Sequence, residues 1–123
     1  ENNKVKILTN VSEELKLSLM SKAKVYLHPM RYEHFGIAVV EAMAAGLVPV
    51  VHRSGGPWID IVDKRKYGFE FEDETELSEI IEFLLNDDSS WREFSEKAVY
   101  RSRAFSFDAF KLRLDSLLKR LGL

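Results

Sequence analysis

Residues 25–52 of the chain are "VYLHPMRYEHFGIAVVEAMAAGLVPVVH", a stretch in which two short β-rich runs flank an apolar run of helix-forming residues. We expect strands at 24–29 and 48–52 and a buried helix at 36–45, which Gly46 is well suited to end in a left-handed conformation. Pro29 closes the first strand because a proline cannot continue the ladder, and Pro49 is tolerable near the first residue of the second. Strands that alternate with helices predict an α/β fold, with a parallel sheet, right-handed crossovers and helices on both faces.

The flanking segments continue this alternation. The β-rich residues 5–10 predict a further strand, and Ser12 with two glutamates behind it predicts a helix to about Ala23. "RSGGP" at 53–57 predicts a turn and a short helix to about Val62, before an extended segment at 67–73. Three more helices follow, each with one apolar face that we assign to the core. The faces comprise Leu77, Ile80, Ile81, Leu84 and Leu85 in a helix ending near Asn86; Trp91, Phe94 and Ala98 in the next; and Phe110, Leu114, Leu117, Leu118 and Leu121 in a helix starting near Ser106.

The composition describes one compact globular domain. With 123 residues and 46% hydrophobic content the chain can form a core, and a formal net charge of −2 offers no general attraction for nucleic acid. It has no cysteine, and three dispersed histidines lack metal-ligand spacing, so we expect no disulfide, no bound metal and a reducing compartment. No run approaches the roughly 18 apolar residues of a membrane span, and the polar start is no signal peptide. We expect a soluble, cytoplasmic chain, which the rest of a larger protein could hold at the cytoplasmic face of a membrane.

Three loops are expected at the edge of the sheet where ligands bind. In parallel sheets ligands lie beyond the carboxyl ends of the strands, and the loops that follow the strands here are residues 10–12, 30–35 and 53–57. A helix that begins at Gly36 presents free backbone N–H groups in its first turn, which suit a diphosphate, and Gly36 allows a ligand to approach closely. Gly55 and Gly56 form a second such loop. The helix start at Gly36 and the loop at Gly55 and Gly56 are each weak evidence for a ligand site. Their expected position at the same edge of the sheet strengthens the prediction.

Two glutamates bear on what this edge binds. Glu41 lies inside an apolar helix, where an unpaired buried carboxylate would cost several kcal/mol, so it needs either solvent or a hydrogen-bond donor. One interpretation places Glu41 on the single exposed edge of a mostly buried helix. The other places it in a cleft, where it accepts hydrogen bonds from ligand hydroxyls as acidic residues do from nucleotide ribose. Glu33, just before the helix, is either an ordinary loop residue or a contact at the mouth of the site.

The spacing of the two glutamates resembles a family signature. Glu33 and Glu41 are separated by seven residues, as in the E-x7-E motif of retaining glycosyltransferases of family 4, which have the two-domain GT-B architecture. The order of further segments also resembles this family, so the resemblance covers nearly the whole chain. Within this family, the sequence most resembles the members that extend a dolichol-linked oligosaccharide with α-1,2-mannose from GDP-mannose. The segments are "VYLHP", "EHFGI", "EAMAAGLVPVV", "SGGPWIDIV", "YGFEF" and "RAFSFDAF".

The resemblance implies a role for each matching residue. Glu33 would be the catalytic-site residue that contacts the transferred sugar, and Glu41 would bind the ribose hydroxyls of the nucleotide. Neither need act as a general acid, and neither metal nor cofactor is implied. The nucleobase would lie beside the turn at Asn10 and Val11. The remaining donor-binding residues, expected to meet the sugar and diphosphate, are His34, Phe35, Gly36 and Ile37, with Gly55 and Gly56 in the following loop.

The resemblance also implies an incomplete domain. Residues 1–123 would be the later part of a C-terminal, Rossmann-like nucleotide-sugar-binding domain, without its first strand, its glycine-rich turn and the Arg/Lys pair that neutralises the diphosphate. The acceptor would bind an N-terminal domain that this chain does not contain, so the chain alone should be inactive. Its uncovered sheet edge should favour self-association.

Two functions remain open at this point. The leading one is the donor-binding part of a glycosyltransferase that moves a hexose, with mannose from GDP-mannose favoured, to a lipid-linked or other glycan acceptor. The alternative is a nucleotide-binding or protein-interaction module of the same fold that performs no catalysis. The absent cations favour the module, and the intact glutamate pair favours the enzyme.

Overall fold

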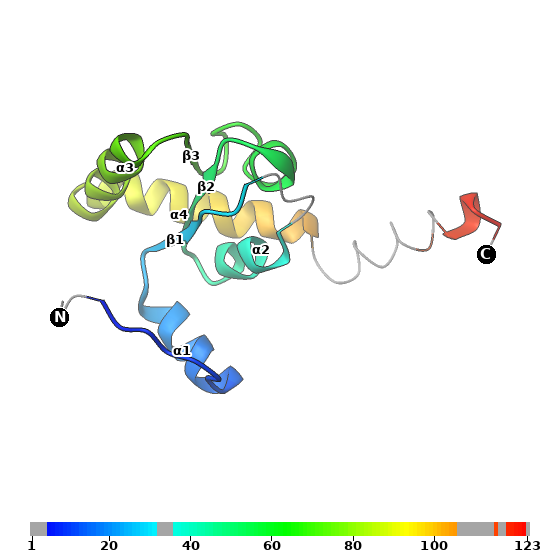
Figure 1. Cartoon of the computed structure of the whole chain (residues 1–123), viewed down its shortest axis with the longest axis horizontal. Helices are drawn as coiled ribbons and strands as arrows, with labels where there is room; N and C mark the ends of the chain where they lie inside the picture. The colour runs from blue at the N-terminus through cyan, green and yellow to red at the C-terminus, as the bar shows by residue number, and fades with distance from the viewer. Residues whose placement is uncertain (1–4, 32–35, 106–114, 116–117, 123) are drawn as a thin grey trace.

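The computed structural model describes residues 5–31, 36–105, 115 and 118–122. A three-stranded sheet in the order β1-β2-β3, with all strands parallel, lies among the helices (Figure 1). This arrangement confirms the predicted α/β fold with a parallel sheet. In chain order, the elements are α1 (Glu13–Lys22), β1 (Val25–His28), α2 (Ile37–Ala44), β2 (Val48–His52), the π-helix η1 (Pro57–Ile61), β3 (Phe69–Phe71), α3 (Glu74–Asn86), α4 (Asp88–Ser102) and the short 3-10 helix η2 (Arg103–Phe105).

The central strand β2 is buried along its whole length, because helices cover both faces of the sheet. Alternate side chains of a strand point to opposite faces, and β2 therefore contributes to two separate hydrophobic clusters. Val51 packs with α2, η1 and α4, whereas Val48 and Val50 pack with β3 and α3. The first cluster contains Val39, Met43, Val51, Ile61, Val62 and Ala98, and the second contains Val48, Val50, Phe69, Phe71 and Leu84.

Pro49 lies inside this central strand without breaking the hydrogen-bond ladder. Val48 N donates to Lys24 O at 2.9 Å and Arg53 N donates to Phe71 O at 2.8 Å. The N–H groups of the even-numbered residues of β2 therefore point towards β1, and those of the odd-numbered residues point towards β3. Since β3 begins opposite the residue after Pro49, the missing N–H falls just before the β3 ladder starts. The prediction that proline is tolerable at this position is confirmed.

The predicted helix ends agree with observed capping. Gly46 adopts a φ of 90° just after α2, in the left-handed region that ends helices. Ser12 accepts a hydrogen bond from Leu15 N at the start of α1, and Asp73 accepts one from Glu76 N at the start of α3. These side chains satisfy backbone donors that a helix leaves free in its first turn.

Two sequence predictions about the flanks are wrong. The predicted strand at residues 5–10 is absent: these residues form no ladder, since β1 pairs only with β2 within the described chain, and a strand requires a hydrogen-bonded neighbour. Leu85 belongs to the predicted apolar face of α3 but is half exposed, because only the Leu84 side of the helix reaches the sheet. The short helix after "RSGGP" is present, with a π-type hydrogen bond from Val62 N to Pro57 O at 2.9 Å.

The last predicted helix falls largely outside the described residues. Its predicted core positions Phe110, Leu114 and Leu117 are among those not described, and Leu121 is exposed. The last described elements in the chain order are α4 and η2.

Helix α1 stands to one side of the sheet and is not packed into the core (Figure 1). None of its residues is buried, although its leucines at 15, 17 and 19 are apolar. Its described link to the rest of the fold is an ion pair between Lys16 and Glu41 of α2, which brings α1 beside the helix that carries the second glutamate.

Candidate functional site

The carboxyl ends of β1 and β2 lie side by side, and Gly36, just before α2, lies against the loop that follows β2. A Cβ atom placed on Gly36 would lie 2.9 Å from Val39 Cγ2 and 3.2 Å from Pro57 Cγ. The start of α2 therefore packs directly against the loop that leads from β2 to η1. The start of α2 and the loop after β2 thus share one edge of the sheet, whereas residues 32–35 of the predicted loop at 30–35 lie outside the described residues.

The start of α2 has uncapped backbone N–H groups, but Gly36 at this position is itself buried. Gly36 occupies the N-cap position and has no side chain, so among the described residues no side chain caps the N–H groups of the first turn. Gly36 itself is buried, and its missing side chain makes room for Val39 and Pro57. The glycine is thus required by packing, and the next residue, Ile37, is exposed.

The loop after β2 is held by a buried polar pair. His52 Nδ1 and Ser54 Oγ lie 2.8 Å apart, and both side chains are buried. Gly55 then adopts a φ of 67°, which favours glycine, and Gly56 is helical and buried. The sequence reasoning selected both glycines but attached no role to His52 and Ser54, because their contact across one residue leaves no signal in composition or periodicity.

Glu41 lies on the exposed side of α2, with 49% of its side chain accessible. Its Oε2 accepts a hydrogen bond from Lys16 Nζ at 3.0 Å. That hydrogen bond, with the negative charges of Glu41 and Glu13, raises the pKa of Lys16 above its ordinary value, so the ammonium group stays protonated at neutral pH. The interpretation that Glu41 occupies an exposed edge is consistent with this geometry, and an exposed carboxylate also remains available to a ligand.

The predicted catalytic-site residue Glu33 and the predicted donor-binding residues His34 and Phe35 lie outside the described residues. Asn10 is described, and its φ of 52° confirms a backbone turn immediately before α1. Val11 follows it on the surface. The roles of these residues stay predictions.

Arg53 is a charged residue of this edge that the sequence reasoning did not single out. Its guanidinium lies 3.3 Å from Glu72 Oε2 and 3.1 Å from Glu76 Oε2, and it connects the loop after β2 to the start of α3. Its Nε is buried and has no acceptor among the described residues. Because two carboxylates already offset its charge, Arg53 is not a free cation for a diphosphate.

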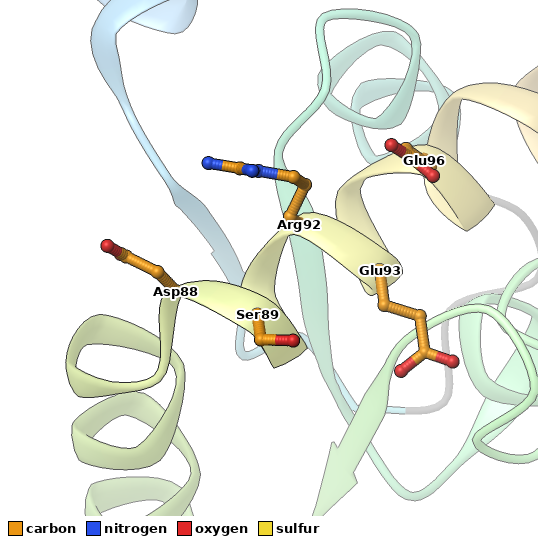
Figure 2. Close-up of a pocket in the computed structure, with 5 residues that line it drawn as sticks. All are labelled: Asp88, Ser89, Arg92, Glu93 and Glu96. Atoms are coloured by element: carbon orange, nitrogen blue, oxygen red, sulfur yellow. The ribbon is translucent and has the colours of Figure 1, made fainter.

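A hollow on the surface of α4 lies away from this edge. Figure 2 shows that its lining residues all come from α4 and that their side chains spread in different directions. The start of α4 lies at the amino end of β1, since Lys24, just before the strand, has its Nζ 3.3 Å from Asp88 Oδ1 and accepts a hydrogen bond from Trp91 Nε1. Parallel sheets bind ligands at the opposite edge, so we exclude this hollow as the donor site.

The described residues contain no group of three histidine, aspartate or glutamate side chains placed to hold a metal ion. A metal-independent reaction stays a prediction. Within the same residues, no helix has both the length and the apolar character needed to cross a membrane.

Comparison with known proteins assigns the family. Residues 1–102 match the family of glycosyl transferases group 1. The chain belongs to this family. The resemblance recognised from the E-x7-E spacing is therefore confirmed.

Relatives of this group 1 glycosyltransferase chain include two curated proteins named GDP-Man:Man(3)GlcNAc(2)-PP-Dol alpha-1,2-mannosyltransferase. The one from Dictyostelium discoideum is 34% identical and covers 98% of this chain and 27% of its own length. The one from Homo sapiens is 38% identical and covers 89% of this chain and 23% of its own. The chain thus spans about a quarter of the length of these relatives.

The fold also has a close counterpart among solved structures. Sucrose-phosphate synthase from Thermosynechococcus elongatus superposes with a TM-score of 0.83 at 25% identity, over 97% of this chain and 30% of that protein. This likeness confirms the predicted fold class, in agreement with the family assignment.

Proposed function

We propose that this chain is the donor-binding part of a retaining glycosyltransferase that transfers mannose from GDP-mannose to a lipid-linked oligosaccharide. The observation that carries the proposal is the position of Glu41. It is an exposed carboxylate on an otherwise apolar helix that begins at the ligand-binding edge of the sheet, in a chain that belongs to this family. The names of the two curated relatives support mannose, GDP and a dolichol-linked acceptor.

In this proposal the residues of the edge act mainly by position and charge. Glu41 accepts hydrogen bonds from the ribose hydroxyls and so fixes the nucleotide. The diphosphate lies at the start of α2, where the helix contributes about half a positive charge and free N–H groups. The start of the helix thereby stabilises the negative charge that develops on the leaving diphosphate. Glu33 contacts the transferred sugar, and the acceptor reaches the site from a separate N-terminal domain.

We further propose a cytoplasmic location, at the membrane that holds the lipid-linked acceptor. The absence of cysteine from the chain supports a reducing compartment.

The test is a calorimetric titration of the full-length protein with GDP, GDP-mannose and UDP-glucose, together with an assay for mannose transfer to a lipid-linked acceptor. We expect guanine nucleotides to bind and transfer to occur. Glu41→Ala should weaken GDP binding by about 10- to 100-fold, because hydrogen bonds to a charged group contribute about 1.5–3 kcal/mol. Glu79→Ala, which removes an exposed carboxylate of α3, is the matched control and should leave GDP binding unchanged.

The outcomes separate the two candidate functions. Binding with transfer supports the enzyme, whereas binding without transfer supports a non-catalytic nucleotide-binding module. Unchanged GDP affinity in Glu41→Ala would show that the ribose assignment is wrong. Preferential binding and transfer from UDP-glucose would overturn the choice of donor.

A further inference from the structure

The ion pair between Lys16 and Glu41 connects two parts of the site that are far apart in the sequence. Lys16 lies one turn into α1, the helix that follows the turn at Asn10, and Glu41 lies in the second turn of α2. The Nζ to Oε2 distance of 3.0 Å is that of a charge-assisted hydrogen bond. A residue from α1 thus contacts the carboxylate that we assign to the ribose.

The pair lies in a hollow between the two helices. One wall carries Lys16 and Met20 of α1, and the other carries Glu41 and Ala44 of α2. The hollow has a volume of about 370 Å³, which is within the range of small-molecule sites, roughly 300–1,000 Å³. Its walls are apolar apart from the charges contributed by the ion pair and Glu13. The hollow extends from Glu41 towards the last turn of α2, and at Glu41 it has room for a sugar ring whose hydroxyls need one fixed acceptor.

The ion pair leaves Glu41 able to bind such a ring. A carboxylate has two oxygens and about four acceptor positions, and Lys16 occupies one position on Oε2. Oε1 accepts no hydrogen bond from any described residue in the structure. Without Lys16, an exposed glutamate side chain would sample several rotamers, and ordering it on ligand binding would cost conformational entropy.

We propose that Lys16 is a positioning residue of the donor site: it holds the Glu41 carboxylate in one orientation, so that Oε1 is preset to accept hydrogen bonds from the vicinal 2′ and 3′ hydroxyls of a nucleotide ribose. This inference rests on the proposed function, because it assumes that Glu41 binds the ribose. It adds that α1 contributes to ribose recognition through a side chain as well as through the turn before it.

The test compares GDP with 2′,3′-dideoxy-GDP on the full-length protein by calorimetry. The ratio of the two dissociation constants measures the contribution of the ribose hydroxyls to binding, since the base and the diphosphate are the same in both ligands. We expect wild type to prefer GDP, and Glu41→Gln to lose most of that preference. Lys16→Met should weaken GDP binding by about two- to fivefold, the size of effect typical of a half-exposed ion pair, and leave the affinity for the dideoxy nucleotide unchanged.

Two further variants control for folding and for charge. Lys16→Arg keeps a cation that can bind the carboxylate and should retain most of the preference for GDP. Lys22→Met removes the same charge from the last turn of α1, away from the hollow, and should behave as wild type. A change in overall stability would alter the affinities for both nucleotides, so an altered ratio is specific to the hydroxyls.

The remaining outcomes overturn one proposal or both. If Glu41→Gln loses the preference while Lys16→Met keeps it, or binds GDP more tightly than wild type, the positioning role is wrong and the ribose assignment stands. If wild type binds neither nucleotide, or binds the two equally, both the positioning role and the proposed ribose contact are wrong.

Discussion

Gly68 shows how one missing side chain allows two strands to approach. A Cβ atom placed on this residue would lie 2.6 Å from Pro49 Cγ and 2.8 Å from Pro49 O, with Val62 Cγ1 at 3.0 Å. The proline ring and the carbonyl oxygen belong to the central strand and cannot move without disturbing the sheet. The residue just before β3 must therefore be glycine for reasons of space.

Gly68→Ala should destabilise the fold by about 1–3 kcal/mol, the usual cost of inserting an atom into a packed interior. Urea unfolding followed by circular dichroism measures this change. Ser78→Ala, at an exposed position of α3, is the control and should change the free energy of unfolding by less than about 0.5 kcal/mol. Equal stability of Gly68→Ala and wild type would show that β3 does not enter the sheet as described.

At the scale of elements, the turn between η1 and β3 has an unusual backbone. Asp63, Lys64 and Arg65 have φ values of 50°, 50° and 85°, and left-handed conformations cost roughly 1–2 kcal/mol per residue for side chains with a Cβ. The turn is closed by a hydrogen bond from Tyr67 N to Val62 O at 2.9 Å. Arg65 also donates two hydrogen bonds to Glu70, at 3.1 and 3.2 Å. These contacts offset part of the strain.

Lys64→Gly should therefore raise the free energy of unfolding by up to about 1 kcal/mol, since glycine adopts a positive φ without the steric cost, although it also gains entropy in the unfolded chain. Lys66→Gly is the matched control. Lys66 is not among the residues with a positive φ, so the same substitution there should destabilise by about 0.5–1 kcal/mol. Thermal unfolding of both variants gives the comparison, and the turn conformation is contradicted if Lys64→Gly is the less stable of the two.

At the scale of the whole molecule, apolar side chains are exposed along the N-terminal segment and α1. The N-terminal segment and α1 lie together on one side of the sheet (Figure 1). Strand β1 is at an edge of the described sheet, and Leu27 of this strand is also exposed. Contiguous apolar surface and an open strand edge both promote association. The exposed side chains of the N-terminal segment and α1 are Val5, Ile7, Leu8, Val11, Leu15, Leu17 and Leu19.

The chain by itself should therefore associate as its concentration rises, which sedimentation velocity measures as an increasing sedimentation coefficient. The double substitution Ile7→Lys and Leu17→Lys should reduce association because it places charge in the apolar surface. Leu85→Lys, at an exposed apolar position of α3, is the control and should leave association unchanged. A monomer at all concentrations would contradict the prediction.

Local patterns were sufficient to predict most of the described elements. The helix and strand between 25 and 52, the left-handed residue at Gly46 and the tolerance for Pro49 follow from side-chain periodicity and backbone chemistry, which act over a few residues. The spacing of Glu33 and Glu41 was also sufficient to recognise the family, because a motif on one loop and helix is contiguous in the sequence.

The sequence by itself thus determined the α/β class, the helix that carries Glu41 and the family of the chain. Only the tertiary structure decided that residues 5–9 lack a strand neighbour, that Gly36 packs on Pro57, and that Lys16 pairs with Glu41 across 25 residues. The physical reason is that periodicity and turn chemistry report interactions within one element. Strand pairing, close packing of loops and ion pairs between helices depend instead on how separate elements come together in space.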